Sequence, residues 1–269
     1  STLFPYTTLF RSPAGQPNRP AIGTFAHLGS GIAMECLALA GFDYVIIDNE
    51  HGPFSVESSL EMVRALQALR CKAFVRVSDS SRASLLRMLD IGADALIIPD
   101  VHSVEEVRKI VEYTKYFPLG RRGFAFSRSA LYGEDKGLRN LDGYFVKTNS
   151  EKWVIPQCET LGALESIEEI VSIEGVNGIF IGPYDLSVAL GAPAQFDTKA
   201  FRQGVEKVLH ACKEYEKIAM IFAGNAKQAE EYWEQGFDMV AIGTDSGFLI
   251  DRGRSVMSEL IKNLGRELR

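Results

Sequence analysis

Short apolar runs alternate with amphipathic stretches along the chain from Ala21 onward. The apolar runs are nearly continuous in Val, Ile, Leu and Phe, which is typical of parallel strands buried on both faces. We therefore predict strands over residues 22–25, 44–48, 73–77, 95–99, 154–158, 178–181, 219–222 and 239–242. Apolar positions recur at helical spacing between these runs, which predicts helices over residues 31–40, 55–69, 81–91, 103–115, 162–173, 197–216, 226–235 and 246–268.

Residues that start and stop helices support this division. The expected N-caps are Ser55, Ser103 and Asp197, and the glycines expected to end helices are Gly41, Gly92 and Gly236. A chain of this length built from strand–helix units is expected to close as an α/β fold, a (β/α)₈ barrel of the TIM type. An open doubly wound sheet is the alternative, but no GxGxxG turn follows the first strand. The segment 117–150 is too long for an ordinary connection and is expected to be functional.

Composition narrows the class of protein. The 269 residues carry a net charge of −6, which argues against a general nucleic-acid binder, and no apolar run is long enough to span a membrane. The four cysteines are scattered without a CxxC pair, so we expect a reducing, cytoplasmic environment. Residues 1–20 show neither helical nor strand period. We expect them to be a non-native or disordered leader, with a single barrel domain over 21–269.

Polar side chains follow several of the predicted strands, at the end of a barrel where active sites form. Glu159 and Asp185 follow two consecutive strands, which are expected to lie about 4.8 Å apart as neighbours. Two ionised carboxylates held this close suit Mg²⁺ or Mn²⁺, which leave open positions for water and substrate oxygens. The alternative is that either acid is a solvated loop residue or a helix cap. We predict a divalent-metal site here.

The second and third strands end in residues suited to proton transfer and anion binding. His51 follows Asp48 by three positions, and a carboxylate that orients a histidine raises its basicity; Glu50 is an alternative orienting acid. Arg76 ends an apolar strand, so its guanidinium must find an anion. A fixed planar donor suits a carboxylate or a developing enolate, although a structural ion pair with Asp48 would also explain it.

Other polar residues carry weaker signals. His27 and His102 follow strands without an evident partner and are left open, whereas His210 lies in a helix and is expected at the surface. Arg121 and Arg122 form either an anion site for a substrate tail or part of a solvated loop. The chain has no P-loop, no HExxH and no GxSxG motif. No lysine follows a predicted strand closely enough to form a Schiff base with a substrate.

Several runs in the right order resemble the HpcH/HpaI aldolase family of metal-dependent class II pyruvate aldolases. These runs are DYVIIDNEHGPFSVE (43–57), AFVRV (73–77), LIIPDV (96–101), PQCET (156–160) and GIFIGPYDLSVALG (178–191). The resemblance covers about residues 21–268 and implies a barrel of the phosphoenolpyruvate/pyruvate type. Phe25 stands where some relatives have Trp, and the aromatic run after Gly123 departs from the family pattern.

The resemblance also implies roles for individual residues. It makes His51 the catalytic base, Asp48 its orienting acid and Arg76 the enolate-stabilising donor, with Mg²⁺, Mn²⁺ or Co²⁺ on Glu159 and Asp185. It implies that Asp90 reaches a neighbouring subunit's site, in a homohexamer built as a trimer of dimers in which the last helix packs on a neighbour. The substrate-binding residues that it implies are Gly182, Pro183 and Tyr184, with either Ser127 or Ala125 on the long loop.

The activity implied is retro-aldol cleavage of a 4-hydroxy-2-oxo (2-keto-3-deoxy) acid to pyruvate and an aldehyde through a metal-bound pyruvate enolate. A malyl- or citryl-CoA lyase would share the metal carboxylates but needs a basic surface, for which only Arg121 and Arg122 are available. An oxaloacetate decarboxylase would use the same enolate chemistry. A barrel without activity would lack at least one core residue of the site, and all of them are present.

Overall fold

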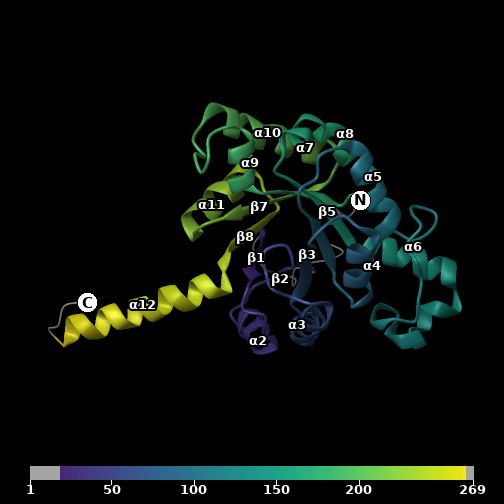
Figure 1. Cartoon of the computed structure of the whole chain (residues 1–269), viewed down its shortest axis with the longest axis horizontal. Helices are drawn as coiled ribbons and strands as arrows, with labels where there is room; N and C mark the ends of the chain where they lie inside the picture. Colours follow the sequence, from purple (N-terminus) through teal and green to yellow (C-terminus); the bar gives the residue numbers. More distant parts are fainter. Residues whose placement is uncertain (1–18, 265–269) are drawn as a thin grey trace.

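The computed structural model describes residues 19–264, and within them eight parallel strands close into a barrel (Figure 1). Each strand pairs with the next, and β8 pairs back onto β1. The strands are β1 (Ala21–Ala26), β2 (Tyr44–Asp48), β3 (Lys72–Arg76), β4 (Ala95–Ile98), β5 (Trp153–Cys158), β6 (Gly178–Ile181), β7 (Ile218–Ala223) and β8 (Met239–Thr244). The predicted (β/α)₈ barrel is therefore confirmed, and the open sheet is excluded.

Helices surround the barrel, and α12 extends away from it (Figure 1, yellow). The helices are α2 (Gly31–Leu39), α3 (Val56–Ala68), α4 (Arg82–Asp90), α5 (Val104–Thr114), η1 (Arg128–Gly133), η2 (Lys136–Arg139), α6 (Leu141–Glu151), α7 (Leu161–Glu165), α8 (Ile167–Ser172), α9 (Pro183–Ala189), α10 (Lys199–Glu214), α11 (Ala226–Gln235) and α12 (Asp245–Asn263). Within residues 19–264, none of these helices could cross a lipid bilayer.

The structure corrects several details of the predicted helices. Thr198 rather than Asp197 caps α10, because the Thr198 side chain accepts the backbone N–H of Phe201. The helix predicted over 162–173 is broken at Ser166 into α7 and α8. The long excursion that begins at residue 117 contains η1, η2 and α6, and the segment after β6 forms α9. None of these four helices was predicted. The leader predicted over 1–20 lies almost entirely outside the described residues.

Alternation along the strands divides the core in two. One cluster fills the barrel, and a larger one lies between the strands and the helices. Along β2, Tyr44 and Ile46 belong to the inner cluster, whereas Val45 and Ile47 belong to the outer one. The ring of Tyr44 fills the space beside Gly23, where an added Cβ would lie only 2.2 Å from it. Because side chains alternate along a strand, Asp48 is the next inward position of β2 after Ile46.

Candidate active site

The last inward positions of β2 and β3 form the centre of the site. Asp48 and Arg76 lie opposite each other in the register of the two strands. Arg76 Nε donates to Asp48 Oδ1 at 2.9 Å, and Nη2 donates to Oδ2 at 2.7 Å. Both residues are buried, Asp48 completely. This two-point pair fixes the plane of the guanidinium and confirms the ion pair that the sequence suggested as an alternative.

Two further contacts hold Arg76 in place. Its Nη1 lies 3.1 Å from Glu50 Oε2, and its guanidinium carbon lies 4.8 Å from the centre of the Phe25 ring. A guanidinium carries five N–H groups, and three of them face these two carboxylates. One N–H on each terminal nitrogen is therefore left for a ligand. Arg76 can serve both the structural pair and an anion in the cavity.

The two histidines near Asp48 are arranged differently from the prediction. His27 Nε2 lies 2.9 Å from Asp48 Oδ2, and since that carboxylate is ionised we assign the proton to Nε2. His51 reaches Asp48 only through its backbone N–H, 3.3 Å from Oδ1. The His51 imidazole is exposed, and its Nε2 lies 3.9 Å from Glu50 Oε2. Glu50, the alternative orienting acid, is therefore the carboxylate nearer the His51 ring.

Asp48 and Arg76 each stabilise the charged form of the other. Burial opposes ionisation of Asp48, but the hydrogen bonds and the charge of Arg76, with a smaller contribution from His27, lower its pKa overall. Burial likewise opposes the charge of Arg76, but Asp48 outweighs it and raises the pKa of the guanidinium. Burial raises the pKa of Glu50, although the charge of Arg76 acts in the opposite direction. Asp48 and Arg76 are thus an ionised pair at the base of the site.

Glu159, which follows β5, and Asp185, in the first turn of α9, line one cavity together. The backbone N–H of Asp100 donates to Glu159 Oε1 at 2.7 Å, and the side-chain amide of Gln157 donates to Oε2. Burial raises the pKa of Glu159, and the nearby Asp185 charge acts in the same direction. A Cβ added at Gly182 would lie 2.6 Å from Glu159 Oε2, so only glycine leaves room for this carboxylate.

These features fit a hard divalent cation. Among the described residues, no group of three or more His, Cys, Asp or Glu side chains converges on one point. The protein would thus supply the carboxylates of Glu159 and Asp185 and leave other positions to water and substrate oxygens, the ligand set that Mg²⁺ prefers. A nearby positive charge would also offset the burial and the smaller repulsion from Asp185 that raise the pKa of Glu159.

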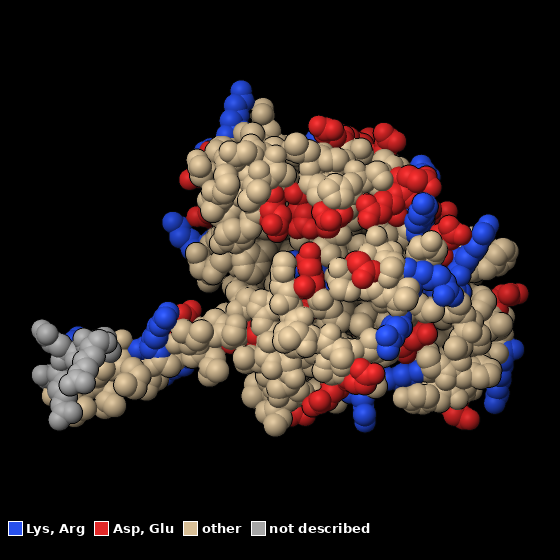
Figure 2. Space-filling view, viewed as in Figure 1, with Lys and Arg blue, Asp and Glu red and all other residues tan. Residues whose placement is uncertain are grey.

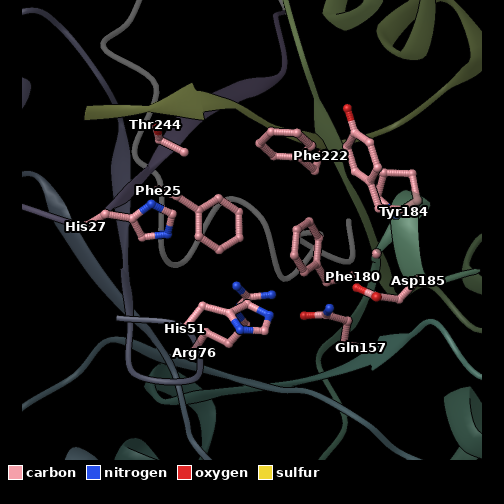
Figure 3. A pocket seen from close by; sticks show the side chains of 12 residues that line it. Phe25, His27, His51, Arg76, Gln157, Phe180, Tyr184, Asp185, Phe222 and Thr244 are labelled. Carbon is pink, nitrogen blue, oxygen red and sulfur yellow. The ribbon is translucent and has the colours of Figure 1, made fainter. Parts of the chain in front are cut away.

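A cavity of about 240 Å³ lies beside Arg76 (Figure 3). Figure 3 shows the rings of Phe25, Phe180 and Phe222 grouped on one side, with Arg76 and His51 together on another. The other lining residues are His27, Gln157, Gly182, Pro183, Tyr184, Asp185 and Thr244. The cavity therefore combines three aromatic rings with a cation and hydrogen-bonding groups, as expected for a small oxo acid.

A second, more polar cavity of about 700 Å³ shares His51 and Asp185 with the first. Its other walls include Glu50, Glu159 and the polar residues that follow β3 and β4. A ligand that extends past His51 from the first cavity would enter the second.

Asp90, predicted to act in a neighbouring subunit's site, and Ser127, predicted for this one, both lie outside the two cavities of this chain. Asp90, at the end of α4, accepts a hydrogen bond of 2.8 Å from Arg122 and lines neither cavity. Ser127 caps no helix with its side chain and lies 3.0 Å from Ser129, also outside both cavities. His210 is exposed on α10, as predicted.

Sequence reasoning left His27 and His102 open. His27 proves to be a partner of Asp48, and its position two residues after the inward Phe25 is the signal that would have shown this. His102 Nε2 lies 2.8 Å from Asp100 Oδ1 and lines the second cavity.

Comparison with known proteins agrees with this geometry. The family model described as HpcH/HpaI aldolase/citrate lyase matches residues 21–251. The chain is 34% identical over 231 residues to a 4-hydroxy-2-oxo-heptane-1,7-dioate aldolase of Escherichia coli, covering 86% of this chain and 87% of that one. It is 31% identical over 227 residues to a 2-keto-3-deoxy-L-rhamnonate aldolase of Salmonella gallinarum, covering 84% and 83%. A solved HpcH/HpaI aldolase/citrate lyase family protein from Burkholderia cenocepacia superposes with a TM-score of 0.83 at 29% identity, covering 91% and 96%.

Proposed function

The chain belongs to the HpcH/HpaI aldolase/citrate lyase family, and we propose that it cleaves a 4-hydroxy-2-oxo acid reversibly to pyruvate and an aldehyde. The observation that carries this proposal is the fixed guanidinium of Arg76, which Asp48 and Glu50 hold while an N–H on each terminal nitrogen stays available. Such a preorganised donor stabilises an oxyanion that develops at the 2-oxo group as the C3–C4 bond breaks.

Glu159 and Asp185 are the proposed ligands of a divalent cation, which when bound supplies Lewis-acid stabilisation of negative charge on the substrate. Gln157 and the Asp100 N–H hold the carboxylate of Glu159 in position.

His51 is the proposed base for the 4-hydroxyl proton. Its imidazole lines both cavities and is exposed enough to exchange protons with water. Glu50 is the carboxylate beside this ring, with its Oε2 3.9 Å from His51 Nε2. The backbone around Gly182, Pro183 and Tyr184 is the proposed binding position of the substrate carboxylate, because these residues line the same cavity as Arg76.

A homo-oligomer, as a trimer of dimers, is part of this proposal. Helix α12 exposes Leu249, Ile250, Val256, Met257 and Leu260, and an apolar stripe of this length is normally covered by another chain. In such an assembly Asp90 could reach the site of a neighbouring subunit, as the family resemblance implies.

Three assays on two variants test the proposal: aldol cleavage, exchange of pyruvate methyl protons in deuterated water, and oxaloacetate decarboxylation. Arg76→Lys keeps the charge but loses the planar set of N–H donors of the guanidinium. The rates of cleavage and of exchange should therefore both fall by about 10²–10³. His51→Ala should lower cleavage by about 10²–10⁴ and spare part of the exchange and decarboxylation, which involve no 4-hydroxyl.

Exposed His210 provides the matched control, and His210→Ala should keep wild-type rates in all three assays. If His51→Ala loses the same factor in each assay, His51 binds substrate instead of acting as the base. If the wild type decarboxylates oxaloacetate but cleaves no 4-hydroxy-2-oxo acid, the protein is a decarboxylase and the aldolase proposal is wrong.

A further inference from the structure

The second cavity is where the part of the substrate beyond C4 must lie, given the proposed function, on which this inference rests. The first cavity contains Arg76 and the aromatic rings, and its volume of about 240 Å³ suits the pyruvate portion. His51, the proposed base for the 4-hydroxyl, stands at the junction because it lines both cavities. The substituent that leaves with the aldehyde therefore points into the second cavity.

The second cavity, which Arg76 does not line, has acidic walls. Asp79, Asp100 and Glu106 line it, in addition to the proposed metal ligands. Asp79 accepts the backbone N–H of Ser81, and hydrogen bonds from Ser81 and Ser78 lower its pKa against the effect of burial. Glu106 accepts hydrogen bonds from Ser80 Oγ and from the backbone N–H of His102. Asp79 and Glu106 are thus held in place by neutral donors, which leave their negative charge uncompensated, whereas Asp100 pairs with the His102 imidazole at 2.8 Å.

No Lys or Arg within residues 19–264 lines this cavity. The two arginines suggested by the sequence as an anion site are engaged elsewhere. The Arg122 side chain is fully buried, pairs with Asp90 at 2.8 Å and stacks on Tyr116. Arg121 extends from the surface and its Nε lies 3.5 Å from Glu112. Figure 2 shows acidic side chains gathered across the face drawn there, with Lys and Arg mostly toward its margin.

The cavity offers hydroxyl and carboxylate partners instead of cations. Ser78, Ser80 and Thr160 lie on its walls together with the three acids. Carboxylates accept hydrogen bonds from hydroxyl groups and repel other carboxylates. We propose that the aldehyde partner of this enzyme is an uncharged, hydroxylated aldehyde and that an aldehyde ending in a carboxylate is selected against.

This assignment separates two kinds of substrate that the relatives' names describe. One relative's substrate is a dioate, which carries a second carboxylate beyond C4, and the other's is a deoxy sugar acid, which carries hydroxyl groups there. The uncompensated charges of Asp79 and Glu106 favour the second kind for this chain.

The test measures aldol addition of pyruvate to matched aldehydes with the full-length enzyme and added Mg²⁺ or Mn²⁺. Succinic semialdehyde is compared with its methyl ester, which has the same chain without the charge, and with glyceraldehyde and lactaldehyde. Each carboxylate at about 6 Å in water disfavours a second one by about threefold, so Asp79 and Glu106 together should lower kcat/KM for the charged aldehyde by about tenfold relative to its ester.

Salt provides a control that needs no variant. Raising the ionic strength from about 0.05 to about 0.5 M screens exposed charges. The ratio of kcat/KM for the ester to kcat/KM for succinic semialdehyde should therefore fall toward one. Removing a charge with Asp79→Asn or Glu106→Gln should reduce the same preference by about threefold, whereas Glu112→Gln, outside the cavity, should not change it.

Equal kcat/KM for succinic semialdehyde and its ester, or a preference for the charged aldehyde at low salt, would overturn the inference. Failure of the proposed function looks different, because then no aldehyde is accepted and pyruvate methyl protons do not exchange. The salt series on the wild type decides the question even if a variant does not fold.

Discussion

Replacing Asp48 by Asn removes one charge from the ionised pair while it keeps the shape of the side chain. Asp48 is fully buried and its oxygens accept from Arg76 Nε and Nη2, His27 Nε2 and the backbone N–H groups of Glu50 and His51. An asparagine keeps one acceptor oxygen, and its NH₂ group must face donors that already point at the other oxygen.

The size of the expected loss of stability follows from the burial of both Asp48 and Arg76. Arg76 is only 8% exposed, so its charge would stay buried without its carboxylate. Breaking a buried pair in this way costs about 3–5 kcal/mol, and in a domain of this size that corresponds to a fall in Tm of roughly 6–20 °C. The variant should also lose activity, because the guanidinium is no longer held for the substrate oxyanion.

The assay is thermal unfolding followed by circular dichroism at fixed protein concentration, with exposed Asp197→Asn as the matched control. The pH dependence gives a second check. The pKa of Asp48 is lower in the folded protein, so its contribution to stability is present above the unfolded pKa of about 4 and is lost as pH falls through the folded pKa. The difference in the free energy of unfolding between the wild type and Asp48→Asn should therefore become smaller at acidic pH. A loss below about 1 kcal/mol at neutral pH would contradict the reasoning.

Three further predictions concern the rest of the site. Chelation should abolish turnover, and added Mg²⁺ or Mn²⁺ should restore it. In the double variant Glu159→Gln/Asp185→Asn, the added cation should not restore turnover. If the double variant keeps wild-type rates after chelation, the metal site is excluded. His27→Ala should lower kcat about tenfold through loss of one hydrogen bond to Asp48, and His27→Gln, which keeps a donor at the Nε2 position, should recover most of it; equal losses would argue against a positioning role. Gly182→Ala should weaken cation binding measured by calorimetry, because its Cβ would meet Glu159 Oε2 at 2.6 Å, and unchanged affinity would show that the carboxylate can move.

The barrel was predictable because its strands are buried on both faces. Val45, Ile47, Tyr44 and Ile46 make β2 apolar on both sides, and this pattern recurs in strand after strand with helices between them. Strand ends were also predictable within one or two residues, so Glu159 and Asp185 could be expected on adjacent strand–helix units. The break at Ser166 and the helix α9 were not, because they depend on packing against neighbouring units and on local backbone geometry.

Side-chain partners were harder to predict than strand positions. Asp48 has His51 three residues away in sequence but contacts the imidazole of His27, which directly follows the neighbouring strand β1. Sequence proximity favoured the wrong ring, whereas the inward alternation of β1 points His27 at the same end of the barrel. Arg122 shows the same limit, since its polarity suggested a surface anion site and its contacts with Asp90 and Tyr116 bury it.

The two interpretations of Arg76 that the sequence offered, a structural ion pair and an oxyanion donor, are complementary. A lysine could not fill both roles, because an ammonium group lacks the second set of N–H donors that a planar guanidinium holds in a fixed direction. The guanidinium uses its Nε edge for Asp48 and one terminal N–H for Glu50, and the same contacts fix the direction of its remaining donors. The burial that makes Asp48 costly to replace therefore also makes Arg76 rigid. Stability and the proposed catalysis depend on one pair, so variants of Asp48 should lose both together, whereas variants of the exposed His51 should lose activity alone.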